Sequence, residues 1–340
     1  MNVVQFTRKP GVGHYSIEGT FAAMRNGLRG EISVRVLPCP FTSQGVLARI
    51  RNIAFARANQ GDVNHILGDV HYLSLSTRKE STILTIHDCG FAYHGSAIRG
   101  LLLRLFWLHL PVRGVSKIVA ISEKTKEEIL RLTRLAPEKI VVIPDCIDDA
   151  FVETPKEFNS VRPKILQIGT RPNKNIVRLA AALRGLSCEL HIVGKTTPEI
   201  ENAVKENGVP HRISVGLSQA ELVKAYAECD LVAFASIYEG FGMPIVEAQA
   251  TGRVVLTSDI EPMKGVAGGA AMLVDPFSVD SIRGGIERLC RDGALRRQFV
   301  ERGRENAKRY RAEVIAKLYL EVYESVFAEA QIMSGNRSSA

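Results

Sequence analysis

Two glutamates, Glu239 and Glu247, are separated by seven residues in the stretch YEGFGMPIVEAQATG (238–252). The glycines between them suit a tight loop, and Pro244 is tolerated in the first turn of a helix because its missing N–H would be unpaired there. The stretch therefore predicts a loop that leads into a helix, with Glu247 in the first helical turn. There a carboxylate complements the helix dipole, or it accepts hydrogen bonds from two neighbouring hydroxyls of a ribose.

The loop between the glutamates offers further contacts. Glu239 comes directly before it and could bind a second polyhydroxylated group. Backbone N–H groups in the loop would face a sugar and its phosphate, and they belong to Gly240, Phe241, Gly242 and Met243. The whole stretch is thus a candidate binding site for a sugar phosphate.

A second candidate site is GTRPNKN (169–175), where Gly169 and Thr170 follow a strand-like run and a helix is expected to start near Asn175. Arg171 and Lys174 place two cations beside that helix N-terminus. Such a pair makes a good receptor for a diphosphate, because hydrogen bonds between charged groups are about twice as strong as neutral ones. The alternative is a solvated basic turn.

The first half of the chain has a glycine-containing loop of its own, KPGVGHYSIEGTF (9–21), after the first strand-like run. Gly11 and Gly13 would let the backbone approach a phosphate or an acceptor at the start of the following helix. The third glycine of G-x-G-x-x-G is missing, which weakens the case for a dinucleotide site. A simple strand-to-helix turn is the alternative.

His87 and Asp88, in IHDCG (86–90), end another strand-like run of the first half. A histidine there could donate a hydrogen bond to a sugar hydroxyl or to a leaving group. Asp88 could fix the tautomer of His87 or cap the next segment. A purely structural histidine is the alternative.

Metal chemistry is not expected, because the chain has no Asp-x-Asp pair and no H-E-x-x-H or comparable ligand cluster. The cysteines show no C-x-x-C spacing, so we expect reduced thiols rather than a zinc site or a disulfide framework. They are Cys39, Cys89, Cys146, Cys188, Cys229 and Cys290. No metal and no cofactor other than a nucleotide co-substrate is predicted.

The elements that would carry these residues alternate between β-rich runs and segments of helical spacing, which indicates parallel strands joined by helices. The β-rich runs of the first half are 3–7, 65–70, 82–88, 117–122 and 139–144. Those of the second half are 164–170, 188–194, 212–216, 229–236 and 253–258. In parallel sheets, ligands bind beyond the carboxyl ends of the strands, where the candidate loops lie. The predicted fold is α/β, with two doubly wound Rossmann-like domains.

We expect the first domain to span residues 1–155 and the second residues 156–312. A helix at 313–331 has apolar residues spaced three and four apart and would pack on one face. These residues are Ile315, Leu318, Tyr319, Val322, Tyr323, Val326 and Phe327.

The composition is that of an ordinary globular protein, with 46% hydrophobic and 24% charged residues and a net charge of +8. The charge favours an acidic partner. The basic amphipathic segment 98–117 could lie on an anionic membrane, or it could be a core helix with a solvated face. The start of the chain has no signal-peptide pattern, so we expect a cytoplasmic protein. A peripheral position on the inner face of the cell membrane is left open.

Together these motifs resemble the retaining glycosyltransferases of family 4, which have the GT-B fold and are also called glycosyl transferases group 1. The spacing E-GFGMPIV-E fits the Glu-x7-Glu motif of that family's second domain. The resemblance extends in order over nearly the whole chain, through GHYSIE, HILGDVHY, ILTIHD, AISEKTKEEI, VIPDCID, QIGTRPNKN and FASIYEGFGMPIVEAQATGRVVLTSDI.

The resemblance implies a second domain that binds a nucleoside-diphosphate-sugar and a first domain that binds the acceptor, with the helix at 313–331 returning to the first domain. It assigns the nucleotide ribose to Glu247 and the donor sugar or its phosphate region to Glu239. It assigns the diphosphate to Arg171 and Lys174, and the donor sugar near the reacting carbon to His87. Gly13 would let the first loop approach the phosphates and the acceptor. The segment from Gly169 to Lys174 is one residue shorter than the commonest family spacing, and Asp145-Cys146 replaces the frequent Asn-Gly.

The resemblance implies a retaining, metal-independent hexosyl transfer to a hydroxyl of a glycan or lipid-linked acceptor, in the synthesis of surface polysaccharide, lipopolysaccharide or glycolipid. Nucleic acid is not an expected partner. Two alternatives remain open. One is an NAD(P)-dependent oxidoreductase with a Rossmann fold, and the other is a non-catalytic membrane-surface protein of the same fold.

Overall fold

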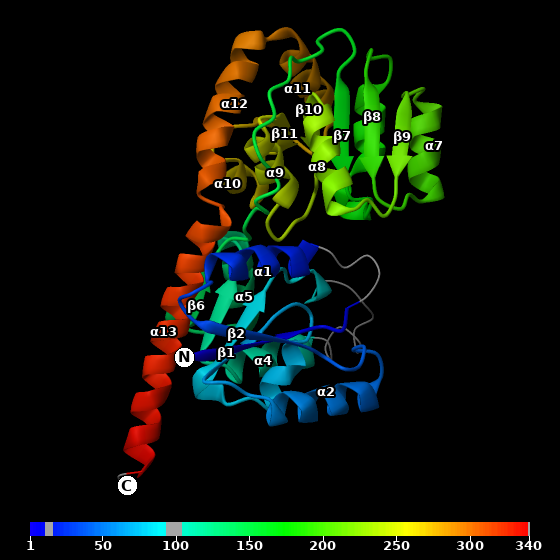
Figure 1. The fold of residues 1–340 in the computed structure, drawn as a ribbon. Helices are drawn as coiled ribbons and strands as arrows, with labels where there is room; N and C mark the ends of the chain where they lie inside the picture. The colour runs from blue at the N-terminus through cyan, green and yellow to red at the C-terminus, as the bar shows by residue number, and fades with distance from the viewer. Residues whose placement is uncertain (11–15, 93–103, 339–340) are drawn as a thin grey trace. The chain divides into compact units, whose positions relative to one another are not determined.

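The computed structural model describes residues 1–10, 16–92 and 104–338. The chain divides into two compact units (Figure 1). Unit 1 comprises Met1–Cys146 and Ala312–Ala340, and unit 2 comprises Ile147–Arg311. The boundary predicted from the sequence, between residues 155 and 156, lies in the irregular segment 148–163 that follows this division.

Unit 1 is built on a six-stranded parallel sheet with the strand order β2-β1-β3-β4-β5-β6 among its described residues. The strands are β1 (Asn2–Thr7), β2 (Ser33–Pro38), β3 (Val63–Ile66), β4 (Thr82–Ile86), β5 (Lys117–Ala120) and β6 (Ile140–Val142). The inner strands β3, β4 and β5 are almost wholly buried, as expected for parallel strands covered on both faces. The α-helices are α1 (Ser16–Gly27), α2 (Val46–Ala58), α4 (Leu110–Arg113), α5 (Glu123–Thr133) and α13 (Ala312–Ser338).

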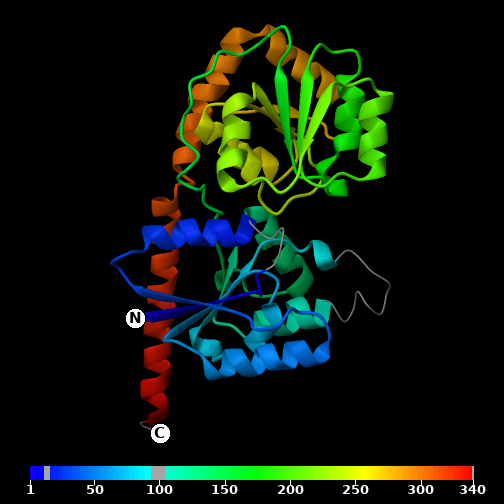
Figure 2. The ribbon, with the colours of Figure 1, turned by 45° about the vertical axis from the view of Figure 1, so that its right-hand side comes forward.

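The last helix, α13, packs into the core of unit 1. Figures 1 and 2 show it in red, running past α1 and the sheet of this unit. Its buried residues include Ile315, Tyr319, Val322, Tyr323 and Val326, and Leu318 and Phe327 are among those partly buried. These are the residues of the apolar face predicted from their spacing.

A buried polar contact fixes α13 further. The Tyr323 hydroxyl lies 2.7 Å from Nδ1 of His65, and Nε2 of the same ring lies 2.7 Å from the Thr85 hydroxyl. Gln5 Nε2 donates to Tyr323 over 3.0 Å. The helix is therefore attached by hydrogen bonds to β1 and β3 directly, and to β4 through His65, as well as by apolar packing.

Unit 2 repeats the architecture, with a parallel six-stranded sheet of order β12-β11-β10-β7-β8-β9. Its strands are β7 (Lys164–Ile168), β8 (Glu189–Val193), β9 (His211–Ser214), β10 (Leu231–Phe234), β11 (Val254–Ser258) and β12 (Met272–Val274). Its α-helices are α6 (Ile176–Leu183), α7 (Pro198–Glu206), α8 (Gln219–Glu228), α9 (Met243–Thr251), α10 (Met263–Ala267), α11 (Val279–Arg291) and α12 (Gly293–Lys308). Helices α6, α7 and α11 share one apolar core against this sheet. Figure 2 shows the sheet of this unit from a second direction.

The prediction of two doubly wound α/β units is confirmed, and every predicted β-rich run overlaps a strand. The run expected at 65–70 forms a strand only at Val63–Ile66. Two strands, β2 and β12, were not predicted. Both lie at sheet edges, and β2 has a half-exposed pattern instead of a continuous apolar run.

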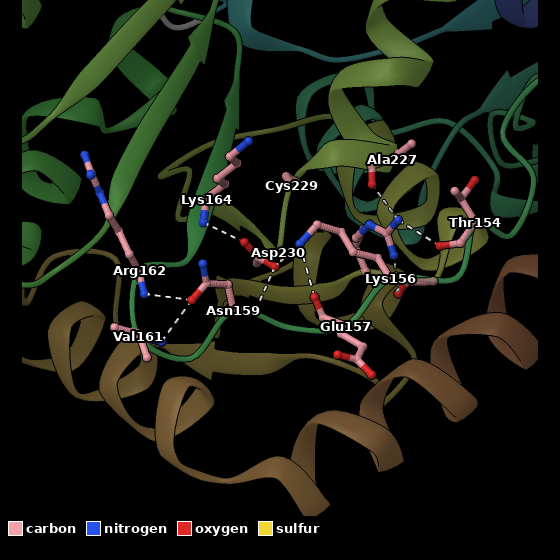
Figure 3. A network of polar contacts seen from close by, with 12 residues as sticks. Thr154, Lys156, Glu157, Asn159, Val161, Arg162, Lys164, Ala227, Cys229 and Asp230 are labelled. Atoms are coloured by element: carbon pink, nitrogen blue, oxygen red, sulfur yellow. Dashed lines mark hydrogen bonds and ion pairs between the residues drawn. The ribbon is translucent and has the colours of Figure 1, made fainter.

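The segment 154–164, near the start of unit 2, is held against the rest of that unit by a network of polar contacts around Asp230 (Figure 3). The Asp230 side chain is 1% exposed, pairs with Lys156, and accepts hydrogen bonds from the N–H groups of Asn159 (3.0 Å) and Lys164 (2.8 Å). Arg253 donates to the carbonyl of Thr154 over 2.8 Å. This network fixes the start of β7, whose far end carries the candidate site.

Candidate active site

The candidate residues of unit 2 lie where the strand order reverses, between β7 and β10. In open parallel sheets this switch point is where ligands bind, because the two adjacent loops diverge to opposite faces of the sheet. The loop after β7 is 169–175 and the loop after β10 is 235–242. These are the two loops that the sequence singled out.

Gly169 allows the first of these loops to fold closely over Lys174. Its φ is +84°, and a Cβ at this position would lie 2.9 Å from Cε of Lys174. A side chain at Gly169 would therefore be strained and would displace Lys174. Of the neighbouring candidates, Thr170 donates its hydroxyl to the Lys195 carbonyl over 2.6 Å, and Arg171 is exposed to solvent.

Two asparagines that the sequence analysis did not select connect the two loops. Asn175 Nδ2 donates to the carbonyls of Ala235 (2.9 Å) and Pro276 (2.7 Å). Asn173 Nδ2 donates to the Tyr238 carbonyl over 2.8 Å, and the Asn173 carbonyl accepts the N–H of Ile237 over 2.9 Å. The loops thus form one hydrogen-bonded structure rather than two independent turns.

Lys174 and Glu239 meet across these loops. The ammonium lies 2.6 Å from Oε1 of Glu239, with side chains that are 16% and 13% exposed. Asn173 also donates to that oxygen, over 3.2 Å, and the ammonium lies 4.6 Å from the centre of the Phe234 ring. The structure therefore brings together a cation and a carboxylate that were predicted to bind neighbouring parts of one ligand.

The loop after Glu239 leads into α9 through Gly242, whose φ of +121° few other residues would adopt. Because Gly242 is the N-cap residue, the helix starts at Met243, one residue before Pro244. Phe241 is buried and packs edge-on against Tyr310, with ring centres 5.5 Å apart. Its side chain thus anchors the loop, and only its backbone can face a ligand.

The prediction that Glu247 lies in the first turn of this helix is wrong. With α9 starting at Met243, the first turn contains no acidic residue and Glu247 falls in the second turn. The helix dipole acts mainly within the first turn, so it does not account for this carboxylate.

Glu247 is instead held by Tyr226 of α8, whose hydroxyl donates to Oε2 over 2.5 Å. Burial raises the pKa of Glu247 to about 7, and the charge of Asp148 acts in the same direction. The hydrogen bond from Tyr226 and the charge of Lys174 oppose this rise in pKa. Glu247 is therefore a partly buried carboxyl group whose raised pKa puts its change of charge near neutral pH.

In unit 1, His87 follows β4 and lies beside Asp145, with Nδ1 and Oδ1 3.8 Å apart. Burial, together with the charges of His71 and Arg8, lowers the pKa of His87 to about 4, so the imidazole is neutral near pH 7. Burial raises the pKa of Asp145 to about 7. Asp88 points elsewhere, since its carboxylate accepts the N–H of Gly90 over 2.7 Å.

The second ring nitrogen of His87, Nε2, is buried and has no hydrogen-bond partner among residues 1–10, 16–92 and 104–338. A buried polar atom without a partner is uncommon and favours a role in binding. Gly11 and Gly13, the other candidates of unit 1, lie outside the described residues.

The amphipathic segment 98–117 is described only from Arg104 onward. Its first described turn, η4 (Leu105–His109), leaves Leu105 38% and Phe106 41% exposed. None of the helices in the described ranges has the length and apolar character needed to span a membrane.

Within the part of the chain that the structure describes, no group of three or more His, Cys, Asp or Glu residues could bind a metal ion. The cysteines are free thiols, as predicted.

Comparison with known proteins covers both units. Residues 14–151 match the family model described as Glycosyltransferase Family 4, and residues 151–306 match the model described as Glycosyl transferases group 1.

Two curated relatives are each 29% identical to the chain. One is an MMP alpha-(1->4)-mannosyltransferase of Mycolicibacterium hassiacum, over 64% of this chain and 56% of the relative. The other is an O-antigen chain mannosyltransferase B of Escherichia coli, over 60% of this chain and 59% of the relative. The chain therefore matches somewhat more than half of the length of these relatives.

Among solved structures, HepE from Anabaena in complex with UDP and glucose superposes with a TM-score of 0.77 at 16% identity. The match covers 96% of this chain and 100% of that one. At this identity the likeness concerns the fold.

Proposed function

The chain belongs to the GT-B glycosyltransferase family that these two models describe, and from that premise we propose that it transfers a sugar from a nucleoside-diphosphate-sugar to a hydroxyl of a glycan or lipid-linked acceptor. The observation that carries this proposal is the contact between Lys174 and Glu239 at the strand-order switch, with Glu247 on the adjoining helix. A cation and two carboxylates at this point suit a ligand that has both phosphates and hydroxyls.

The proposed donor contacts follow from this arrangement. The Lys174 ammonium carries several donor hydrogens, so it can keep its bond to Glu239 and still bind a phosphate oxygen. Arg171 is exposed beside it and would bind the same diphosphate. Glu247 would accept from the ribose hydroxyls, Glu239 would contact the sugar, and the N–H groups of 240–243 would line the space between them.

The donor sugar is proposed to be a hexose, with mannose as the first candidate, because the curated relatives are named mannosyltransferases. The name of one of them also connects it with the O-antigen chain. We therefore propose a role in the synthesis of surface polysaccharide or lipopolysaccharide. The HepE structure contains UDP, so uridine and guanosine nucleotides both belong in the first trials.

The proposed mechanism is a front-face displacement with retained configuration. The acceptor hydroxyl attacks the anomeric carbon as the nucleoside diphosphate departs, and the leaving phosphate takes the acceptor proton. Lys174, Arg171 and the N-terminus of α6 would stabilise the departing charge without a metal ion. His87, which is neutral near pH 7, would contact the donor sugar near its reacting carbon.

Both carboxylates lie on one loop-helix segment, so they do not form the flanking pair of a glycosidase. The mechanism therefore needs no covalent glycosyl-enzyme intermediate. A peripheral position on the inner face of the cell membrane is proposed from the exposed Leu105 and Phe106 beside Arg104.

Nucleotide binding tests this proposal. The unfolding temperature is measured with UDP, GDP, ADP or NAD at about 1 mM, with magnesium or with a chelator. A ligand at about 100 times its Kd stabilises the folded state by about 2.7 kcal/mol, which the assay resolves. We expect a chelator-independent shift with one nucleoside diphosphate that is clearly smaller in Glu247→Ala. A shift with NAD alone would contradict the proposal.

A further inference from the structure

Tyr226 directs a buried hydroxyl at the carboxylate proposed to bind the ribose. Its side chain has a relative exposure of 0%, and its hydroxyl donates to Glu247 Oε2 over 2.5 Å. In a helix with apolar neighbours, such a tyrosine would be expected to serve only as core packing. However, a phenol that donates to a partly buried carboxylate also determines where that carboxylate points.

Tyr226 is itself held in place from two directions. The Phe151 ring packs edge-on against it, with ring centres 5.3 Å apart. Arg253 donates to the Tyr226 carbonyl over 2.9 Å and to the Ala227 carbonyl over 2.7 Å, which fixes the end of α8. These contacts fix the Tyr226 ring and the end of α8, and with them the position of the hydroxyl.

This hydrogen bond prepares Glu247 for a ligand. A carboxylate has about four acceptor sites, and the bond from Tyr226 uses one of them. Within residues 1–10, 16–92 and 104–338, no other group donates a hydrogen bond to this carboxylate, so its remaining sites can accept from hydroxyl donors. Because the side chain is already ordered, ligand binding does not have to restrict its rotation. The same bond favours the ionised, hydrogen-bond-accepting form of Glu247 against the effect of burial.

We propose that Tyr226 is a positioning residue for the nucleotide ribose: its hydroxyl orients the Glu247 carboxylate so that Oε1 meets the ribose hydroxyls. This inference rests on the proposed function, because it takes Glu247 as the ribose contact. It predicts that the preference of the protein for ribonucleotides over 2′-deoxyribonucleotides depends on the Tyr226 hydroxyl.

The experiment compares the Kd values of UDP and 2′-deoxy-UDP, and of GDP and 2′-deoxy-GDP, for the wild type and for Tyr226→Phe. The wild type should bind the ribonucleotide about tenfold more tightly, the change expected for one hydrogen bond to a charged group. In Tyr226→Phe this ratio should fall toward one. Tyr323→Phe, which removes a buried tyrosine hydroxyl from unit 1, is the matched control and should keep the wild-type ratio.

The outcomes separate the inference from the proposed function. A wild-type preference that persists in Tyr226→Phe, even with weaker binding of both nucleotides, would overturn the inference and show a structural role. A wild type that binds both nucleotides equally would refute Glu247 as the ribose contact, and the inference with it.

If Tyr226→Phe does not fold, a second comparison removes the charge of Glu247 as well, so that no carboxylate loses its hydrogen bond from Tyr226. The double variant Tyr226→Phe/Glu247→Gln is compared with Glu247→Gln alone. The two should bind the ribonucleotide and its deoxy analogue with the same affinities, because Tyr226 acts through the carboxylate. A further loss of about tenfold in the double variant would overturn the inference.

Discussion

Replacing Lys174 with methionine should lower turnover by a factor of about 10²–10³, the cost of removing one preorganised group that stabilises developing charge. The side chain is 16% exposed and is held by Glu239 at 2.6 Å, by the Phe234 ring and by close packing over Gly169. Two unit charges about 4 Å apart interact by about 4 kcal/mol at an effective dielectric constant of about 20. This interaction energy is of the same size as the free energy that corresponds to a loss of turnover of about 10²–10³-fold.

The assay follows release of the nucleoside diphosphate from the donor, with kcat and KM measured separately. Because the charge on the phosphate grows in the transition state, most of the loss should be in kcat. Methionine keeps the apolar stem over Gly169, and the unfolding temperature reports any cost of leaving Glu239 with fewer partners. Lys224→Met, at a side chain that is 73% exposed in the same unit, is the control. Turnover unchanged in Lys174→Met would refute the assignment of the diphosphate to this residue.

Three further predictions concern other residues. Because burial raises the pKa of Glu247 to about 7, nucleotide affinity should fall as the pH drops below about 7 and the carboxyl gains a proton. In calorimetric titrations, Glu247→Gln should weaken nucleotide binding about tenfold at about pH 8 and should abolish this pH dependence. An unchanged pH profile in the variant would argue against the ribose contact. His87→Ala should lower kcat by about 10–100-fold with nucleotide affinity unchanged, whereas an equal loss of affinity would move its role to the nucleotide. Asp230→Ala should lower the free energy of unfolding, measured in denaturant, by about 3–5 kcal/mol. Glu228→Ala, at a side chain that is 40% exposed, is the control and should lower it by less than about 1 kcal/mol. Similar losses of stability in the two variants would contradict the importance of the buried network.

Much of the fold could be predicted because buried parallel strands give continuous apolar runs, as β4 and β10 do. The edge strand β2 escaped prediction because its residues are exposed or only partly buried, and β12 because it has only three residues. The face of α13 was predictable because its apolar spacing reports burial directly.

The candidate site was predictable only in part. Residue types identified Lys174, Glu239 and Glu247, and the order of strands puts their loops side by side. Spacing alone does not reveal that Asn173 connects the two loops, nor that Tyr226 bonds to Glu247, since both contacts join residues far apart in the chain. The start of α9 was misplaced because it depends on the positive φ of Gly242, which the sequence permits but does not require.

The most direct test of the central claim is a transfer reaction followed by proton NMR, in a chelator, with UDP- and GDP-hexoses and a panel of mono- and disaccharide acceptors. We expect one nucleotide sugar to be consumed with release of its nucleoside diphosphate, and the anomeric proton of the new bond to show the configuration of the donor. The reaction should be at least about a hundredfold slower in Lys174→Met. A product of inverted configuration would contradict the front-face mechanism, and a protein that consumes none of these donors but binds NAD would contradict glycosyl transfer itself.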